Sequence, residues 1–312
     1  MTHVFVINPC AGARDIGDDI AAEVDRIGLD AELYETTAPR DATRFVAQWC
    51  ADHPGEAVRF YACGGDGTLN EVVSGAVGHD CEVACYPCGS GNDYIKCWPE
   101  ADFGDIASLV AAEAVPVDVL RVTGDCGERY AVNVLNFGFE AEVCRTMEVV
   151  RRWPLFGGRA AYVTGIIHCL LHKRHNPCNI TVDGEAWHSG DILLASAASG
   201  RYVGGGYMCA PRAEVDDGWL EALAVDAISV ARFVKLIGFY KKGEHLERHE
   251  MHDVVHYRRA RRMTFESDRE FSIVLDGELL RCTRVEAECL EKAIRFAAPQ
   301  SRELRSLNPS KK

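Results

Sequence analysis

The stretch VRFYACGGDGTLNEVV, residues 58–73, decides the fold of the first part of the chain. Its first six residues, 58–63, are an apolar run that predicts a buried strand, and Gly64 and Gly65 end that strand. An apolar pattern of helical period begins at Leu69. A buried strand that passes through a glycine turn into a helix is typical of a parallel α/β sheet.

The segments around this stretch repeat the same order of elements. We expect strands over residues 4–7, 31–34 and 83–86, and helices over 18–28, 41–49 and 69–77. Strands that alternate with helices predict a three-layer α/β domain. After residue 117 the runs 117–122, 130–135, 179–183, 191–195, 262–265 and 271–275 favour strands, and only 159–171 and 229–240 favour helices between them.

This change of pattern predicts an α/β protein of two domains. The first is an N-terminal three-layer α/β nucleotide-binding domain over residues 1–115, completed by residues 290–312. The second, over residues 116–289, is a β-sandwich-like domain. A chain of 312 residues is long enough for two cores of ordinary size.

The charge is unevenly distributed along the chain, whose formal net charge is -13. Residues 1–135 hold 8 Lys and Arg against 23 Asp and Glu, whereas residues 136–312 hold 26 against 24. An acidic N-terminal half argues against a nucleic-acid partner, because neutralising phosphates needs a basic surface. The sequence has neither a run of about 18 apolar residues nor a signal peptide, so we expect a cytoplasmic protein whose 14 cysteines are thiols.

Three polar turns follow three of the predicted strands of the first domain. They are NPCAG at residues 8–12, GGDGTLN at 64–70 and PCGSGND at 87–93. Ligands of open α/β sheets bind beyond the carboxyl ends of the strands, where all three turns would lie. Glycine lets main-chain N–H groups approach phosphate oxygens, and the start of a helix adds a positive dipole. None of the turns has the P-loop or the dinucleotide-binding pattern, so we expect a nucleotide bound through another motif.

These turns resemble the signature of the diacylglycerol kinase catalytic-domain family, the soluble bacterial lipid kinases. GGDGTLNEVV at 64–73 is similar to its central motif, NPCAG at 8–12 to its first nucleotide loop, and PCGSGND at 87–93 to its third. The resemblance continues in order through NFGFEA at 136–141, GGGYMCAP at 204–211, DDGWL at 216–220 and DGE at 276–278. It therefore covers nearly the whole chain.

The resemblance implies that the γ-phosphoryl group of ATP is transferred to a lipid hydroxyl, with diacylglycerol the expected acceptor and phosphatidic acid the product. Such a reaction needs positioned phosphates, Mg²⁺ and a carboxylate that accepts the alcohol proton. The residues that would contact the nucleotide are Asn8, Pro9, Cys10, Ala11, Gly12, Thr36, Gly64, Gly65, Asp66, Gly67, Thr68, Leu69, Asn70, Ser90, Asn92 and Asp93. Asp66, among glycines, would also hold Mg²⁺.

Two carboxylates near residue 277 are the candidates for the proton acceptor. Asp276 and Glu278 would project to the same side if one strand continues through them, and each would then raise the pKa of the other. The resemblance implies that Glu278 is the proton acceptor, with Asp276 the second candidate. The alternative is an ordinary hairpin turn at residues 276–277.

The resemblance also implies a structural Mg²⁺ site in the second domain. Asp217 would supply a carboxylate, with Glu214 and the main-chain carbonyl of Trp219 as neighbours, and Asp216 could substitute. Oxygen ligands of this kind suit Mg²⁺ or Ca²⁺. The alternative is a turn capped by acidic residues.

Several features leave alternatives open. An NAD kinase-like phosphotransferase, which shares GGDGT, would accept a soluble alcohol, and a non-catalytic binding protein would keep the loops alone. The histidines and cysteines between residues 168 and 178 could bind Zn²⁺ or merely end a helix. The basic run 258–262 could attract anionic lipid or lie in a solvated face. We expect a lipid substrate presented at a membrane surface, with transient association there, and a homodimer is left open.

Overall fold

A computed structural model describes residues 1–12, 16–150 and 158–299. The chain divides into two compact units, the first made of residues 1–118 and 291 onward, the second of residues 119–290. The limits expected from the sequence were 1–115 with 290–312, and 116–289; of these, residues 300–312 lie outside the described part. The chain passes between the units along two strands, β5 (Ala114–Gly124) and β15 (Glu278–Ala297).

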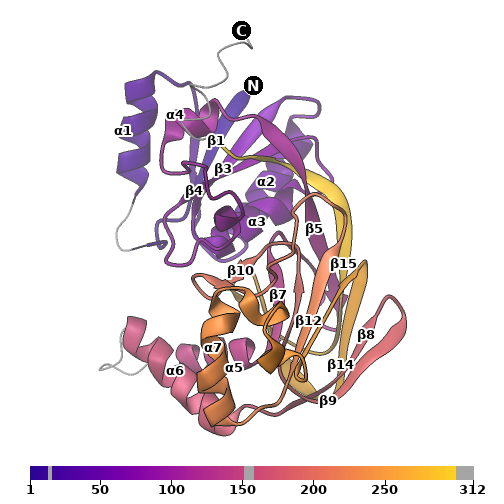
Figure 1. Ribbon diagram of the computed structural model, residues 1–312. Helices are drawn as coiled ribbons and strands as arrows, with labels where there is room; N and C mark the ends of the chain where they lie inside the picture. Colours follow the sequence, from indigo (N-terminus) through magenta and orange to yellow (C-terminus); the bar gives the residue numbers. More distant parts are fainter. Residues whose placement is uncertain (13–15, 151–157, 300–312) are drawn as a thin grey trace. The chain divides into compact units, whose positions relative to one another are not determined.

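The first unit is a parallel sheet with helices. Its strands are β1 (Thr2–Ile7), β2 (Glu32–Glu35), β3 (Val58–Gly64) and β4 (Glu82–Pro87), in the order β2-β1-β3-β4, and the last residues of β15 add a parallel strand beside β4. The helices are α1 (Gly17–Ile27), α2 (Asp41–Asp52), α3 (Asp66–Ala76), the 3₁₀ turn η1 (Tyr94–Cys97) and α4 (Ile106–Val110). Helix α2 packs on α3, and α1 contacts α4 (Figure 1).

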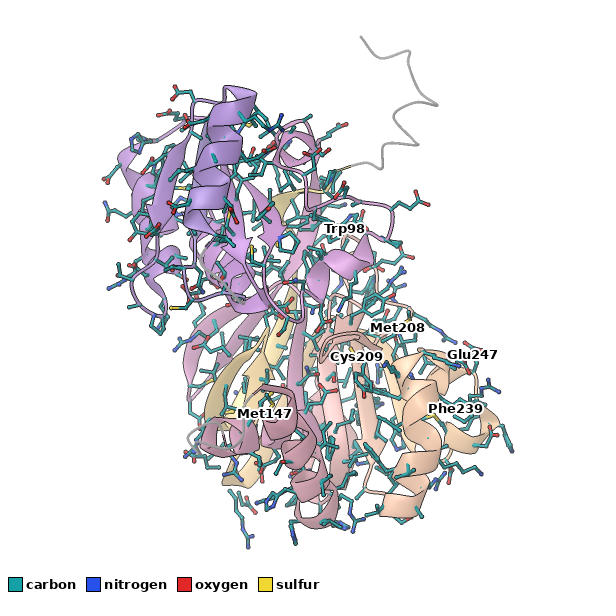
Figure 2. All side chains as sticks on the ribbon, turned by 90° about the vertical axis from the view of Figure 1, so that its left-hand side faces the viewer. Trp98, Met147, Met208, Cys209, Phe239 and Glu247 are labelled. Atoms are coloured by element: carbon teal, nitrogen blue, oxygen red, sulfur yellow. The ribbon has the colours of Figure 1, made fainter. Side chains whose placement is uncertain are left out.

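Burial explains why this sheet holds the first unit together. All seven residues of β3 are buried, as expected for a central parallel strand covered on both faces. Trp98, labelled in Figure 2, stacks on Phe296 of β15 with ring centroids 4.9 Å apart, so the last part of β15 is packed into the first unit. The three-layer α/β domain expected from the sequence is therefore confirmed.

The second unit is mostly antiparallel. Its strands are β6 (Gly127–Ala131), β7 (Val134–Gly138), β8 (Asn176–Val182), β9 (Glu185–Ala198), β12 (Leu220–Asp226), β13 (Val255–Ala260) and β14 (Arg262–Leu275), with the greater parts of β5 and β15 and a small hairpin of β10 (Tyr202–Val203) and β11 (Tyr207–Met208). The strand order is β13-β12-β9-β7-β14-β15; β8 pairs with β9 and β14, and β5 with β6 and β15.

Three helices accompany these strands, together with two 3₁₀ turns. They are α5 (Phe139–Val150), α6 (Gly158–His172) and α7 (Val230–Lys241), with η2 (Glu244–Leu246) and η3 (His249–Met251). Figure 1 shows the three helices grouped beside the strands of this unit. Helix α5 follows β7 without a turn and was absent from the sequence-based expectation, although Phe139, Val143 and Met147 recur four residues apart.

Two buried clusters form the core of the second unit. The strand core contains buried residues from strands only, among them Ala222 and Ala224 of β12. The helix-side core joins strand residues to the helices, and takes Leu223 and Val225 from the same strand. The alternation along β12 shows one strand with both faces buried. The β-sandwich-like character expected for this domain is confirmed.

Candidate active site

Three glycine-containing turns lie at the carboxyl ends of three adjacent strands of the first unit. Residues 8–12 follow β1, the segment from Gly65 follows β3, and residues 88–93 follow β4. Because β1, β3 and β4 are parallel neighbours, these ends meet at one edge of the sheet. The structure therefore brings together the three segments that the sequence indicated.

Glycine is required where these turns touch. A Cβ on Gly89 would lie 2.5 Å from the Cα of Gly65, and a Cβ on Gly12 would lie 2.5 Å from the carbonyl oxygen of Cys88. The Cys88 N–H also donates to the Gly64 carbonyl at 2.8 Å. The turns pack backbone against backbone, which leaves room for main-chain N–H groups to approach a ligand closely.

Side chains also join the first turn to the second. The Asn8 side-chain amide donates to the Thr68 hydroxyl at 3.0 Å, and Oδ1 of the same side chain accepts the Cys10 N–H at 3.0 Å. Thr36, which follows β2, lies next to the end of β1, since its N–H donates to the Ile7 carbonyl at 2.8 Å. The predicted nucleotide residues that follow β1 and β2, and those at the start of α3, thus lie along one edge of the sheet.

Asp66 is the first residue of α3 and lies close to Asp93. The Asp93 N–H donates to the Asp66 carboxylate at 2.6 Å, and the Lys96 ammonium is 2.5 Å from the Asp93 carboxylate. Burial, and then the nearby Asp93 carboxylate, raise the pKa of Asp66, while backbone N–H groups of residues 92–94 oppose that rise. A carboxylate in this state would be stabilised by a bound cation. Lys96 was not singled out in the sequence, although its spacing of three residues from Asp93 was visible.

The other predicted nucleotide residues differ in how much they expose. Cys10, Gly12, Gly67 and Ser90 are exposed, whereas the side chains of Leu69 and Asn70 are buried. The Leu69 N–H donates to the Gly65 carbonyl within the first turn of α3. Leu69 therefore contributes packing, and its N–H is already engaged by the helix.

Asp276 lies in the second unit, in a two-residue turn between β14 and β15. Both turn residues have positive φ, 45° at Asp276 and 96° at Gly277, and Leu275 pairs with Glu278. The buried Asp276 carboxylate accepts the N–H groups of Val132, Asn133 and Val134 at 2.7, 3.2 and 2.8 Å. These bonds hold the segment between β6 and β7, which the sequence had suggested as one continuous strand.

Glu278 has a different environment. Its side chain is half-buried at the first position of β15, and no hydrogen bond to its carboxylate is found among the described residues. Because the strand ends at Leu275, the expectation that one strand carries Asp276 and Glu278 on the same side does not hold. The geometry leaves Glu278 available to accept a proton and engages Asp276 in holding the backbone.

The acidic turn at residues 214–219 is arranged around arginines. The Asp217 carboxylate accepts the Trp219 N–H at 3.0 Å and pairs with Arg259, and Arg261 donates to the Gly218 carbonyl. The Arg261 guanidinium lies 4.4 Å from the centroid of the Trp219 ring. Glu214 is exposed. Of the three Mg²⁺ ligands that the resemblance implied, the Asp217 carboxylate is paired with a guanidinium and Glu214 is exposed, so a structural Mg²⁺ site at this turn stays a prediction.

The histidine and cysteine segment at residues 168–178 does not converge on one point. Cys169 is buried in the helix-side core, whereas Cys178 is buried in the strand core. The His168 and His172 rings lie 4.9 Å apart on α6. The two cysteines therefore cannot complete one zinc site with these histidines.

The basic run at residues 258–262 is largely neutralised. Arg258 pairs with Glu185 at 3.3 Å and Arg262 with Glu288 at 2.9 Å, in addition to the contacts of Arg259 and Arg261 described above. A small pocket nearby, of about 180 Å³, is lined by Arg212, His245, Leu246, His252, Val255 and Tyr257. Its volume is below the roughly 300 Å³ at which small-molecule sites begin, so it is too small for a lipid.

Two family models match the chain. The model described as "Diacylglycerol kinase catalytic domain" matches residues 2–122, and the model described as "YegS C-terminal NAD kinase beta sandwich-like domain" matches residues 133–298. The first match contains the three glycine turns, and the second contains Asp276 and Glu278.

Curated relatives match along most of their length. The chain is 28% identical over 291 residues to a "Probable lipid kinase YegS-like" of Xanthomonas campestris pv. campestris, covering 89% of this chain and 90% of the relative. It is 27% identical over 283 residues to the "Diacylglycerol kinase" of Bacillus subtilis, covering 88% of each chain.

Experimental structures share the fold. A diacylglycerol kinase of Bacillus anthracis superposes with a TM-score of 0.66 at 18% identity, covering 95% of this chain and 96% of the other. The yeast NADH kinase in complex with NADH reaches a TM-score of 0.54 at 11% identity, covering 100% and 89%. Within the described residues, no helix has the length and apolar character needed to cross a membrane.

Proposed function

The chain belongs to the lipid kinase family that joins a diacylglycerol kinase catalytic domain to a YegS C-terminal domain, and from this we propose that it transfers the γ-phosphoryl group of ATP to the hydroxyl of a lipid. We propose diacylglycerol as the acceptor and phosphatidic acid as the product, in the cytoplasm. The observation that carries the proposal is the meeting of three glycine turns at one edge of the sheet in the first unit.

This edge supports phosphate binding by its backbone. At the close approach of Gly65 and Gly89 the second and third turns meet backbone to backbone. Helix α3 begins at Asp66 and directs the positive end of its dipole toward the same place. The first unit carries few basic side chains, so main-chain N–H groups and the helix dipole would supply most of the positive potential there.

The carboxylates at this edge fit a divalent cation. The Asp93 N–H donates to the Asp66 carboxylate, and burial, followed by the charge of Asp93, raises the pKa of Asp66. We propose that Asp66, supported by Asp93, holds Mg²⁺, with Lys96 compensating the Asp93 charge. Mg²⁺ bound there would neutralise charge on the transferring phosphoryl group.

We assign the proton transfer to Glu278. Its carboxylate is half-buried and is not committed to a hydrogen bond within the described residues, so it can accept the proton of the attacking hydroxyl. Asp276 acts as a positioning residue, because the three backbone N–H groups that donate to its carboxylate hold the turn that precedes Glu278. The base and the phosphate-binding turns belong to different units of the chain.

The protein would reach its lipid substrate at an anionic membrane surface, and it would bind that surface transiently. Helix α6 exposes Ile167 and Leu171 at 54% and 58%, and these residues share one face because they are four positions apart. His168 and His172 are exposed beside them. We propose that this apolar strip inserts shallowly between lipid headgroups.

An acceptor screen tests the proposed activity. The protein is incubated with γ-³²P-labelled ATP and Mg²⁺ together with vesicles containing diacylglycerol, phosphatidylglycerol, ceramide, a long-chain base or a polyprenol, and separately with NAD. We expect label in the lipid fraction, strongest with diacylglycerol. Labelling of NAD with no label in any lipid would replace the proposal by a soluble-acceptor kinase, and no transfer at all would leave a non-catalytic binding protein.

A further inference from the structure

Three potential metal ligands of the second unit, none of them among the site residues considered above, lie close together. His188 comes from β9, Asp226 from the end of β12 and His256 from β13, which are neighbouring strands in the order β13-β12-β9. Their ligand atoms all lie within 4.8 Å of one another. Their positions in the sequence are too far apart to form a local motif.

The carboxylate lies between the two imidazoles. His188 Nε2 is 3.3 Å from Asp226 Oδ1, and His256 Nε2 is 3.2 Å from Asp226 Oδ2. The centroids of the two rings are 5.0 Å apart. Both histidines therefore direct Nε2 toward the Asp226 carboxylate, one to each of its oxygens.

The backbone around Asp226 is irregular and firmly held. The register between β12 and β9 shifts between Val225 and Asp226. Such irregularities redirect side chains and occur often at functional sites. The Asp226 N–H donates to the Val254 carbonyl at 2.9 Å, and the next N–H, that of Ala227, donates to the Asp191 carbonyl at 3.2 Å. These bonds fix the position from which the carboxylate projects.

The distances suit a tetrahedral metal ion. Bonds of about 2.0–2.1 Å from zinc to imidazole nitrogen or carboxylate oxygen place neighbouring ligand atoms about 3.3 Å apart in a tetrahedron. Each imidazole nitrogen lies at 3.3 or 3.2 Å from one of the two Asp226 oxygens, close to this edge length. Coordination through a single carboxylate oxygen would need rotation of the carboxylate and of the imidazole rings.

The environment suits a cation with one position open. The His188 side chain is 13% exposed, whereas those of Asp226 and His256 are 32% and 39% exposed. Trp187 lies edge-on to His256, with ring centroids 6.3 Å apart, and packs on the strand core, so it covers one side of the group.

We propose that His188, Asp226 and His256 bind a divalent transition-metal ion, with Zn²⁺ the best match to two imidazoles and one carboxylate. Water would complete the coordination on the exposed side. The ion would join β9, β12 and β13 at the end of the sheet, and its role is stabilising the second unit. The proposal does not depend on the kinase activity.

Cobalt titration tests this proposal. The full chain is freed of metal with a chelator and titrated with Co²⁺ under reducing conditions, following the visible absorption that tetrahedral Co²⁺ gives. We expect one saturable site that Zn²⁺ displaces. His188→Gln, Asp226→Asn and His256→Gln should each abolish that signal. His175→Gln should retain it, because His175 forms a similar pair with Asp191 but has no third ligand among the described residues. Equal binding in wild type and the three variants, or no binding in wild type, would overturn the proposal.

A second measurement identifies the atoms that bind the metal. The cluster of Asp125, Cys126 and Cys282 is a competing thiol-containing group in the same unit, and Cys126→Ser removes it without touching the histidines. X-ray absorption of the zinc-loaded wild-type chain should show nitrogen and oxygen neighbours at about 2.0 Å. Sulfur neighbours at about 2.3 Å that vanish in Cys126→Ser would assign the metal to the thiols and contradict the histidine site.

Discussion

Gly89 lies against Gly65 so closely that a Cβ on Gly89 would be 2.5 Å from the Gly65 Cα. The contact joins the turns that follow β3 and β4, and both atoms belong to backbone that cannot turn aside as a side chain would. The absence of a side chain at position 89 is therefore a structural requirement of the proposed phosphate site.

Gly89→Ala should separate these two turns. We expect a loss of about 1–3 kcal/mol in the free energy of unfolding, from overpacking, and a larger proportional loss of ATP affinity. Chemical denaturation and nucleotide titration measure the two effects. Gly104→Ala is the matched control, since its Cβ would meet nothing closer than 3.5 Å, and it should behave as wild type. Unchanged ATP affinity in Gly89→Ala would argue against the phosphate site.

Asp66→Asn should stabilise the metal-free protein while removing its activity. The raised pKa of Asp66 means that the folded state disfavours the ionised carboxylate, so this group lowers stability increasingly as pH rises above its ordinary value of 3.8. The neutral amide avoids that cost and can keep the bond from the Asp93 N–H. Thermal melts should show a higher Tm for the variant at pH 7 and a shrinking difference as pH falls toward 3.8.

The same variant separates stability from catalysis. Phosphoryl transfer should be lost at every Mg²⁺ concentration, because the carboxylate that holds the cation is gone. A variant that is active at wild-type rates, or less stable than wild type at neutral pH, would contradict the assigned role of Asp66.

Asp276→Asn should weaken the second unit as well as the reaction. The amide can present only one acceptor oxygen to the N–H groups of Val132, Asn133 and Val134, so at least one of these buried donors loses its partner. We expect a loss of about 1–3 kcal/mol in stability and a fall in kcat with the KM for ATP unchanged. Asp268→Asn changes an exposed carboxylate of β14, the strand that precedes the turn, and serves as the control. A pure rise in KM for ATP would be the unexpected result.

The exposed apolar strip on α6 should be needed for binding to lipid vesicles. The double variant Ile167→Ser and Leu171→Ser should sediment much less with anionic vesicles, because two apolar side chains would no longer enter the interface. Turnover of a short-chain, water-dispersed diacylglycerol should stay the same. Val234→Ser removes an exposed apolar residue of α7 and tests whether any such residue has this effect. Vesicle binding equal to wild type in the double variant would exclude this strip as the docking surface.

Local patterns were sufficient to predict the first unit. β1, β3 and β4 are short apolar runs ended by Asn8, Gly64 and Pro87, and the turn after each lies where a parallel sheet must place it. The nucleotide residues are correspondingly clustered in sequence. Helix α5 could also have been found, since Phe139, Val143 and Met147 repeat at helical spacing.

Several features of the second unit could not be predicted from the sequence, because they depend on contacts between residues that are far apart along the chain. Asp276 bonds to N–H groups more than 140 residues earlier, which is why the predicted strand over 130–135 is divided into β6 and β7. Asp217 meets Arg259 from β13, 42 residues away, and the sequence pattern of the acidic turn did not indicate this pairing. Distant strands in an antiparallel unit bring such side chains together, and periodicity does not encode the pairing.

We propose that Glu278 accepts the proton of a lipid hydroxyl while the γ-phosphoryl group of ATP is transferred to that hydroxyl. Glu278→Gln keeps the size of the side chain and removes its basicity, and Glu270→Gln, at an exposed glutamate of the same unit, is the control. With diacylglycerol vesicles and labelled ATP, kcat of Glu278→Gln should fall by at least about 100-fold while ATP affinity and Tm stay near wild type. A wild-type rate of lipid phosphorylation in Glu278→Gln would show that Glu278 is not the proton acceptor.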